Sequence, residues 1–118
     1  MNFRTKNQFY LLVIFLFLSV VSFAQVSVCS WNIMNLGKSK SNSELDVMAN
    51  AIKSYDIIAI QEVVAGYGGS QAVSRLVSIL NTKGSKWDYS ISEPTTSTNP
   101  SSQERYAFIW KTAQVKKV

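Results

Sequence analysis

The stretch DIIAIQEV, Asp56 to Val63, indicates how the chain folds. Four apolar residues in a row, Ile57 to Ile60, are typical of a strand that is covered on both faces of its sheet. Gln61 and Glu62 follow at the point where such a strand should end. A carboxylate at the end of an apolar strand is either solvated there or points into a site that needs negative charge.

The segments on both sides of this stretch alternate between strand and helix patterns. Residues 26–33 are rich in β-branched and aromatic residues and predict a strand. Ser41 to Glu44 have the S-x-x-E pattern of a capping box that begins a helix, and the apolar residues after it follow at helical spacing: Leu45, Met48, Ala49 and Ile52. Similar spacing predicts a second helix over 71–80. Further strands are expected over 87–92, 105–111 and 114–118, with loops over 35–42, 63–70 and 93–103.

This order of elements predicts an α/β fold, with helices packed on a mixed sheet. Two helices can cover little of both faces of a sheet with five strands. We therefore expect residues 25–118 to be the N-terminal part of a larger domain. Half of such a sheet has an unpaired edge and a bare apolar face, which favours aggregation.

The first 24 residues have the pattern of a secretory signal peptide. Arg4 and Lys6 precede an apolar run from Phe9 to Val21, and residues 22–24 form a small-residue cleavage site. The run is shorter than the roughly 18 residues of a membrane-spanning helix, which favours cleavage over an uncleaved anchor. We expect secretion to the periplasm or the exterior, a new N-terminus at Gln25, and no stable membrane association after cleavage.

The composition limits the chemistry that the chain can perform. It has 12 Lys and Arg, 7 Asp and Glu, and no histidine. Without residues 1–24, ten basic and seven acidic residues leave a net charge of +3, which suits an anionic partner but does not require one. The single cysteine, Cys29, cannot form an internal disulfide, and its place in an apolar run predicts a buried, unreactive thiol. Ser27 and Val28 before it do not form a lipobox, which disfavours a lipoprotein.

Three polar residues lie at predicted strand ends: Asn32, Glu62 and Glu104. In an open α/β sheet, ligands bind beyond the carboxyl ends of parallel strands, so Asn32 and Glu62 should lie side by side. Glu104 joins them if its strand runs antiparallel. One carboxylate beside an amide suits Mg²⁺, whose shell is often completed by water and substrate phosphate. Such an ion could polarise a phosphoryl oxygen or activate a water. The alternative is that these are ordinary exposed residues at strand ends.

Four segments carry a resemblance to a known family: CSWNIMNLG (29–37), YDIIAIQEV (55–63), SEP (92–94) and ERYAFIWK (104–111). In this order they resemble successive motifs of the endonuclease/exonuclease/phosphatase superfamily, and most closely its deoxyribonuclease I branch. The Q-E-V strand end is a feature of the superfamily, whereas S-E-P and E-R-Y-x-F are features of the branch. The resemblance implies a deoxyribonuclease-I-like α/β sandwich whose C-terminal half is missing here.

The resemblance also implies a role for each strand-end residue. Glu62 matches the glutamate that binds Mg²⁺ or Mn²⁺, and Asn32 matches the asparagine beside the metal and the scissile phosphate. Glu104 matches the glutamate that orients a catalytic histidine. In the family, water attacks phosphorus in line, assisted by a His–Asp pair that lies in the C-terminal half. A structural Ca²⁺ is a further expectation of the branch, without assignable ligands in this sequence.

The chain departs from the family pattern at three positions that contact duplex DNA. Met34 and Val64 stand where family members have arginines, and Ser102 stands where they have a tyrosine that stacks in the minor groove. Because phosphate contacts supply much of the affinity for DNA, these changes argue against efficient cutting of duplex DNA. The absence of histidine removes the general base, and loss of acid–base help typically costs about 10²- to 10⁴-fold in rate.

The sequence therefore predicts a secreted, metal-dependent phosphodiesterase with nucleic acid as substrate, most closely an endonuclease that cuts DNA. The 118-residue chain by itself is expected to be an incomplete, inactive fragment. One alternative is a member of the same superfamily that acts on a phospholipid or a sugar phosphate. Another is a secreted binding module that kept the scaffold and lost catalysis.

Overall fold

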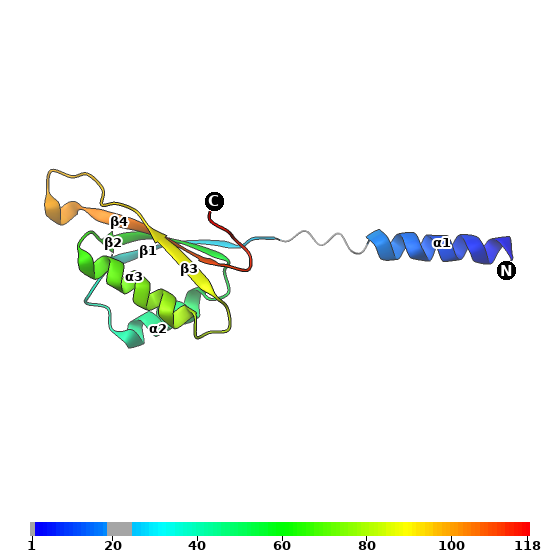
Figure 1. The fold of residues 1–118 in the computed structure, drawn as a ribbon, viewed down its shortest axis with the longest axis horizontal. Coiled ribbons are helices and arrows are strands. Elements are labelled where there is room, and N and C mark those ends of the chain that lie inside the picture. Colours follow the sequence, from blue (N-terminus) through cyan, green and yellow to red (C-terminus); the bar gives the residue numbers. More distant parts are fainter. Residues whose placement is uncertain (1, 19–24) are drawn as a thin grey trace.

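The structure, a computed structural model, describes residues 2–18 and 25–118. These residues form an α/β fold with one sheet of four strands and three α-helices (Figure 1). In chain order the elements are α1 (Phe3–Leu18), β1 (Val28–Leu36), α2 (Asn42–Ile52), β2 (Ile57–Val64), α3 (Tyr67–Leu80), β3 (Trp87–Ile91), a short 3₁₀ helix (Pro100–Ser102) and β4 (Glu104–Lys111).

Helix α1 contains the basic start and most of the apolar run of the predicted signal peptide. In Figure 1 it stands apart from the sheet and its two helices. Within the described residues, no helix combines the length and the apolar character needed to cross a membrane. The expected cleavage site at residues 22–24 lies outside the described residues.

The sheet has the strand order β1-β2-β4-β3 and mixes parallel and antiparallel pairs. β1 and β2 are parallel, joined by the crossover helix α2, whereas β4 pairs antiparallel with both β2 and β3. Parallel neighbours need such a long crossover, because the end of the first strand and the start of the second lie at opposite sides of the sheet. The carboxyl ends of β1 and β2 and the start of β4 therefore meet at the same edge.

Both sheet-packing helices lie on the same face of the sheet (Figure 1). α2 begins at the predicted capping box: the Ser41 side chain accepts a hydrogen bond from the Glu44 backbone, and the Glu44 carboxylate accepts one from the Ser41 backbone. The four residues expected to form the apolar stripe of this helix are all buried: Leu45, Met48, Ala49 and Ile52. The predicted capping and packing of α2 are confirmed.

The other face of the sheet is largely open, which corrects the expectation of a strand covered on both sides. Ile58 and Ile60 are 0% and 1% exposed against the helices, whereas Ile57 and Ala59, which point the other way, are only half-buried. On the same open face, Phe108 of β4 is 50% exposed. The run of apolar residues in β2 is therefore continuous in sequence but alternates in burial, because successive side chains point to opposite faces.

Two loops and one strand differ from the sequence-based expectations. β1 continues to Leu36 and β2 to Val64, so the expected loops over 35–42 and 63–70 are shorter. Residues 114–118 do not form the expected fifth strand. The backbone N–H groups of Gln114 and Val115 both donate to the Lys111 carbonyl, and this turn ends the pairing with the sheet.

Gly68 and Gly69 lie in the first turn of α3 and not in a loop, and Gly66 is the N-cap of this helix. A Cβ atom on Gly69 would collide with the carbonyl oxygen of Val64. Only glycine allows the helix to pack this closely on the end of the strand. The connection between Glu62 and α3 is consequently short, and the backbone there is closely packed.

Candidate functional site

The ends of β1 and β2 bring Asn32 and Glu62 into direct contact. Asn32 lies opposite Gln61 in the parallel register, and its Nδ2 atom donates a hydrogen bond of 2.8 Å to Oε1 of Glu62. The Asn32 side chain is exposed and that of Glu62 is half-buried. The expectation that the two side chains lie side by side is met, while their roles stay predictions.

Glu62 occupies a β-bulge with an unusual backbone conformation. Between Ile60 and Val63, β2 has one residue more than the facing segment of β4, and Glu62 has a φ of 57°. Asn35, in the irregular end of β1, has the same φ of 57°. In a regular strand Glu62 would point away from the face that carries Gln61, so the bulge re-aims its carboxylate toward Asn32. Residues held in sparsely populated backbone regions cluster at functional sites.

Glu104 joins this edge because β4 runs antiparallel to β2. It pairs with Val64 in the register, and its side chain lines the same open cavity as that of Glu62, with a volume of about 300 Å³. β4 therefore runs antiparallel to β2, the direction that is needed to bring Glu104 to Asn32 and Glu62. The Tyr106 hydroxyl donates a hydrogen bond of 3.1 Å to Oε1 of Glu104. That bond is the largest cause that raises the pKa of the Tyr106 phenol above its ordinary value of 10.0, and the negative charge of Glu104 adds to it.

Arg105 holds two loops against the site, a role that sequence reasoning did not find. Its Nε atom donates to the Ala65 carbonyl at 2.7 Å, and Nη1 donates to the Ser92 carbonyl at 3.0 Å. Arg105 therefore fixes the chain just after Glu62 and the start of the S-E-P segment. Its place between Glu104 and Tyr106 in the E-R-Y motif is the available signal, but the motif does not show which carbonyls the guanidinium meets.

The cavity beside Glu62 and Glu104 is polar and has no basic side chain in its lining within the described residues. Val64 and Ser102, two of the departures from the family pattern, both line it, together with Ser101 and Gln103. The third departure, Met34, is 72% exposed on β1 beside Asn32. A phosphate that enters this cavity meets two carboxylates and no cation of the described chain.

The donor set at the strand ends fits a hard cation. Among the described residues no three His, Cys, Asp or Glu side chains gather into a metal-binding group. Mg²⁺, however, is often held by one or two carboxylates, with water and substrate phosphate as the other ligands. In the described structure Oε1 of Glu62 accepts the Asn32 amide, which leaves Oε2 for an ion. The neighbouring Asn32 side chain carries an amide oxygen, a donor of the kind that such an ion prefers.

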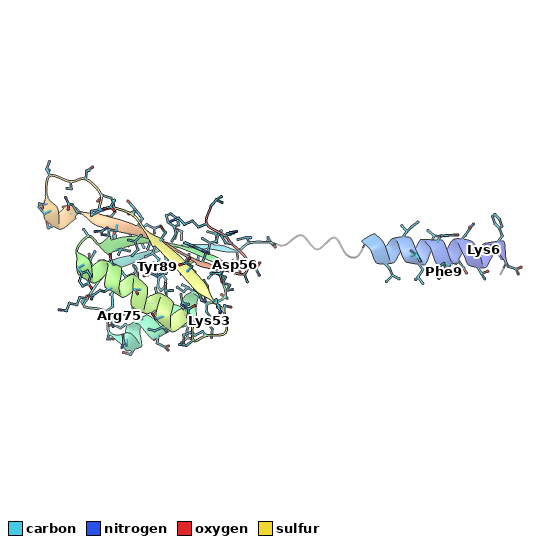
Figure 2. The ribbon with its side chains drawn as sticks, in the orientation of Figure 1. Lys6, Phe9, Lys53, Asp56, Arg75 and Tyr89 are labelled. Atoms are coloured by element: carbon cyan, nitrogen blue, oxygen red, sulfur yellow. The ribbon has the colours of Figure 1, made fainter. Side chains whose placement is uncertain are left out.

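Two further acidic residues lie away from this edge. Asp56, labelled in Figure 2, is at the other end of β2. It accepts hydrogen bonds from Ser27, and its Oδ1 atom lies 3.4 Å from Nζ of Lys111. Asp88, in β3, is exposed and accepts a hydrogen bond from the next backbone N–H. Neither carboxylate lines the cavity with Glu62 and Glu104.

Comparison with known proteins gives no family for the chain. No protein-family model matches it, and no curated protein matches it.

Proposed function

We propose that this protein is a divalent-metal-dependent phosphodiesterase that resembles deoxyribonuclease I, with DNA as its substrate. The observation that supports this most is the contact between Asn32 and the bulged Glu62, close to Glu104 at one sheet edge. The backbone of Glu62 is strained, and among the described residues its carboxylate accepts a single hydrogen bond, from the neutral amide of Asn32. Its negative charge is therefore available to an incoming cation. All three residues fall on motif positions that the resemblance assigns to the active site.

Each of the three residues would have a distinct task in phosphodiester hydrolysis. Glu62 would hold Mg²⁺ or Mn²⁺, which when bound stabilises negative charge on the phosphoryl oxygens. The Asn32 amide orients the Glu62 carboxylate and lies where it can donate to a phosphate. Glu104 would orient a histidine that acts as general base. The 118 residues contain no histidine, so that base must come from outside this sequence.

The open face of the sheet supports the proposal of an incomplete sandwich. Val28 and Phe108 are 62% and 50% exposed on the face that the helices do not cover. Exposed apolar patches of this kind usually mark surfaces that another element covers. A second sheet packed on this face would complete a deoxyribonuclease-I-like sandwich and bring further residues to the edge with Glu62.

Export of the protein is part of the same proposal. The basic residues at the start of the chain and the apolar α1 suit a signal peptide that is removed after translocation. A hydrolase of extracellular or periplasmic DNA would need such a signal. The structural Ca²⁺ of the branch stays an expectation without assigned ligands.

A second candidate substrate is favoured by the lining of the cavity. Its hydroxyl and amide groups, from Ser101, Ser102 and Gln103, suit a small hydroxylated group better than the charged backbone of a duplex. The described lining also has no aromatic side chain on which a base could stack. A sugar phosphate or a lipid headgroup joined by a phosphodiester is therefore the alternative to DNA.

The test is metal-dependent hydrolysis by the 118-residue chain with imidazole added to replace the missing base. We expect no nicking of supercoiled plasmid with Mg²⁺ alone, and slow nicking with Mg²⁺ and imidazole that Glu62→Gln abolishes. Glu44→Gln, on the exposed start of α2, is the matched control and should leave the rate unchanged. Hydrolysis of bis(p-nitrophenyl) phosphate without plasmid nicking would favour the small-substrate alternative. Rates that do not depend on Glu62 or Mg²⁺ would contradict the proposal.

A further inference from the structure

We propose that Tyr106 is a positioning residue that fixes the orientation of the Glu104 carboxylate. This inference rests on the proposed function, in which Glu104 orients the general base. From sequence alone, the place of Tyr106 two residues after Glu104 is equally consistent with a residue that only supports the strand.

The contact follows from the geometry of the strand. Residues two apart in a strand point to the same face, so the side chains of Glu104 and Tyr106 are neighbours. The Tyr106 hydroxyl donates to Oε1 of Glu104 at 3.1 Å. Tyr106 is 38% exposed, on the open face of the sheet, so its ring has room to be replaced without a cavity in the core.

The backbone on both sides of this contact is already fixed. The Glu104 backbone N–H donates to the Thr95 hydroxyl at 3.1 Å, and the Thr95 N–H donates to the Glu104 carbonyl at 2.8 Å. The Tyr106 N–H donates to the Ser92 hydroxyl at 2.9 Å. The freedom that is left lies in the side-chain torsions of Glu104, which has several staggered rotamers in water. The Tyr106 hydroxyl restricts this freedom.

The pairing also suits the task proposed for Glu104. A carboxylate has two oxygens, and Tyr106 occupies Oε1, which leaves Oε2 to accept a hydrogen bond from the base. The Tyr106 phenol is a neutral donor near pH 7, and the hydrogen bond to Glu104 raises its pKa further above 10.0. In metal sites, removal of a hydrogen-bond partner that orients a ligating side chain typically costs about 10- to 100-fold in metal affinity or activity.

The experiment measures the rotamer of Glu104 directly, by NMR three-bond Hα–Hβ couplings in the 118-residue chain. We expect couplings of one dominant χ1 rotamer in the wild type, and a shift toward the average of three rotamers in Tyr106→Phe. This variant keeps the ring and should keep the wild-type Tm, so a merely structural role would leave the couplings unchanged. Tyr89→Phe, which removes a hydroxyl from β3, is the matched control and should change neither quantity.

A second readout follows the phenol itself. The Cζ chemical shift of Tyr106, followed against pH, should give a lower pKa in Glu104→Gln than in the wild type, and Glu93→Gln should not change it. Equal Glu104 couplings in the wild type and Tyr106→Phe, or equal Tyr106 titrations in the wild type and Glu104→Gln, would overturn the inference. Neither readout needs metal or substrate, so a failure of metal binding at Glu62 is distinguishable from a failure of this proposal.

Discussion

The two ends of β2 each carry a carboxylate, and these two carboxylates differ in their charged partners and in their backbone conformation. Asp56, before the strand, accepts hydrogen bonds from the Ser27 backbone at 2.9 Å and the Ser27 hydroxyl at 2.8 Å, and it forms an ion pair with Lys111. Glu62, near the far end, lies in a left-handed bulge and accepts one hydrogen bond, from the neutral amide of Asn32. The chain provides the positive partner of Asp56, whereas the described residues provide none for Glu62.

This difference separates a carboxylate with a structural role from one that we propose to be functional, at the two ends of the same strand. Asp56 lies just before β2, and it contacts Ser27 before β1 and Lys111 at the end of β4. These interactions connect the three strands and stabilise the fold. Glu62 is held in a conformation that an L-residue rarely adopts, and its charge is not neutralised by the described chain. A fold tolerates such a residue when the surroundings fix it. Here the Asn32 amide contacts the Glu62 carboxylate, while Gly69 packs on the Val64 carbonyl and Arg105 binds the Ala65 carbonyl, which fixes the backbone just after Glu62.

The largest effect on stability that this comparison predicts is at Glu62, where the glycine variant should be more stable than the alanine variant. Glu62→Gly and Glu62→Ala both lose the bond to Asn32, but only glycine relieves the positive φ. An L-residue in the left-handed region costs roughly 1–2 kcal/mol, so we expect Glu62→Gly to be about 1 kcal/mol more stable than Glu62→Ala. Urea denaturation measures the difference. The usual order, with alanine more stable, would mean that Glu62 carries no strain.

The matched pair at the other end of the strand sharpens this result. Asp56 has no positive φ, so Asp56→Gly should be less stable than Asp56→Ala. The two ends of β2 should thus show opposite orders for the same pair of replacements. The same order at both ends would remove the distinction between a strained and an unstrained carboxylate.

A smaller effect, confined to acid pH, is predicted for Asp56. The Ser27 backbone N–H, the Ser27 hydroxyl and Lys111 together hold the pKa of Asp56 below its ordinary value of 3.8, with the backbone hydrogen bond as the largest cause. A carboxyl with a lowered pKa in the folded state contributes stability above its unfolded pKa and loses it as the pH falls through the folded value. The Tm of the wild type should therefore exceed that of Asp56→Asn at pH 7, and the gap should close below about pH 4.

Ser27→Ala provides the control for this prediction. It removes the hydroxyl but keeps the backbone N–H that contributes most, so the acid-dependent part of the stability should shrink and not disappear. A gap between wild type and Asp56→Asn that stays constant from pH 7 to pH 2 would show that the Asp56 charge does not stabilise the fold.

Parts of the fold and the site were predictable from local sequence patterns. The capping box at Ser41 and the apolar spacing after it act within one helix, so they predict α2 correctly. The meeting of Asn32 and Glu62 follows from one rule, that the ends of parallel strands share an edge. That rule needs only the strand order and not the details of packing.

Other parts depend on contacts that the local sequence does not specify. The bulge at Glu62 arises from a register shift against β4, some 40 residues later, and no glycine marks it. The partners of Arg105 are two main-chain carbonyls in distant loops, which no motif identifies. The one-sided burial of β2 was mispredicted because a run of apolar residues does not say how many layers cover it.

The most direct test of the proposed metal site is a titration of the 118-residue chain with Mn²⁺, followed by paramagnetic broadening of its amide and side-chain NMR signals. We expect Asn32, Glu62 and Glu104 to broaden first, Mg²⁺ to compete with the effect, and Glu62→Gln to weaken it by at least about tenfold. Asp56→Asn, at the other end of the strand, should leave the titration unchanged. Broadening that starts elsewhere, or that survives Glu62→Gln, would contradict the assignment of Glu62 as the metal ligand.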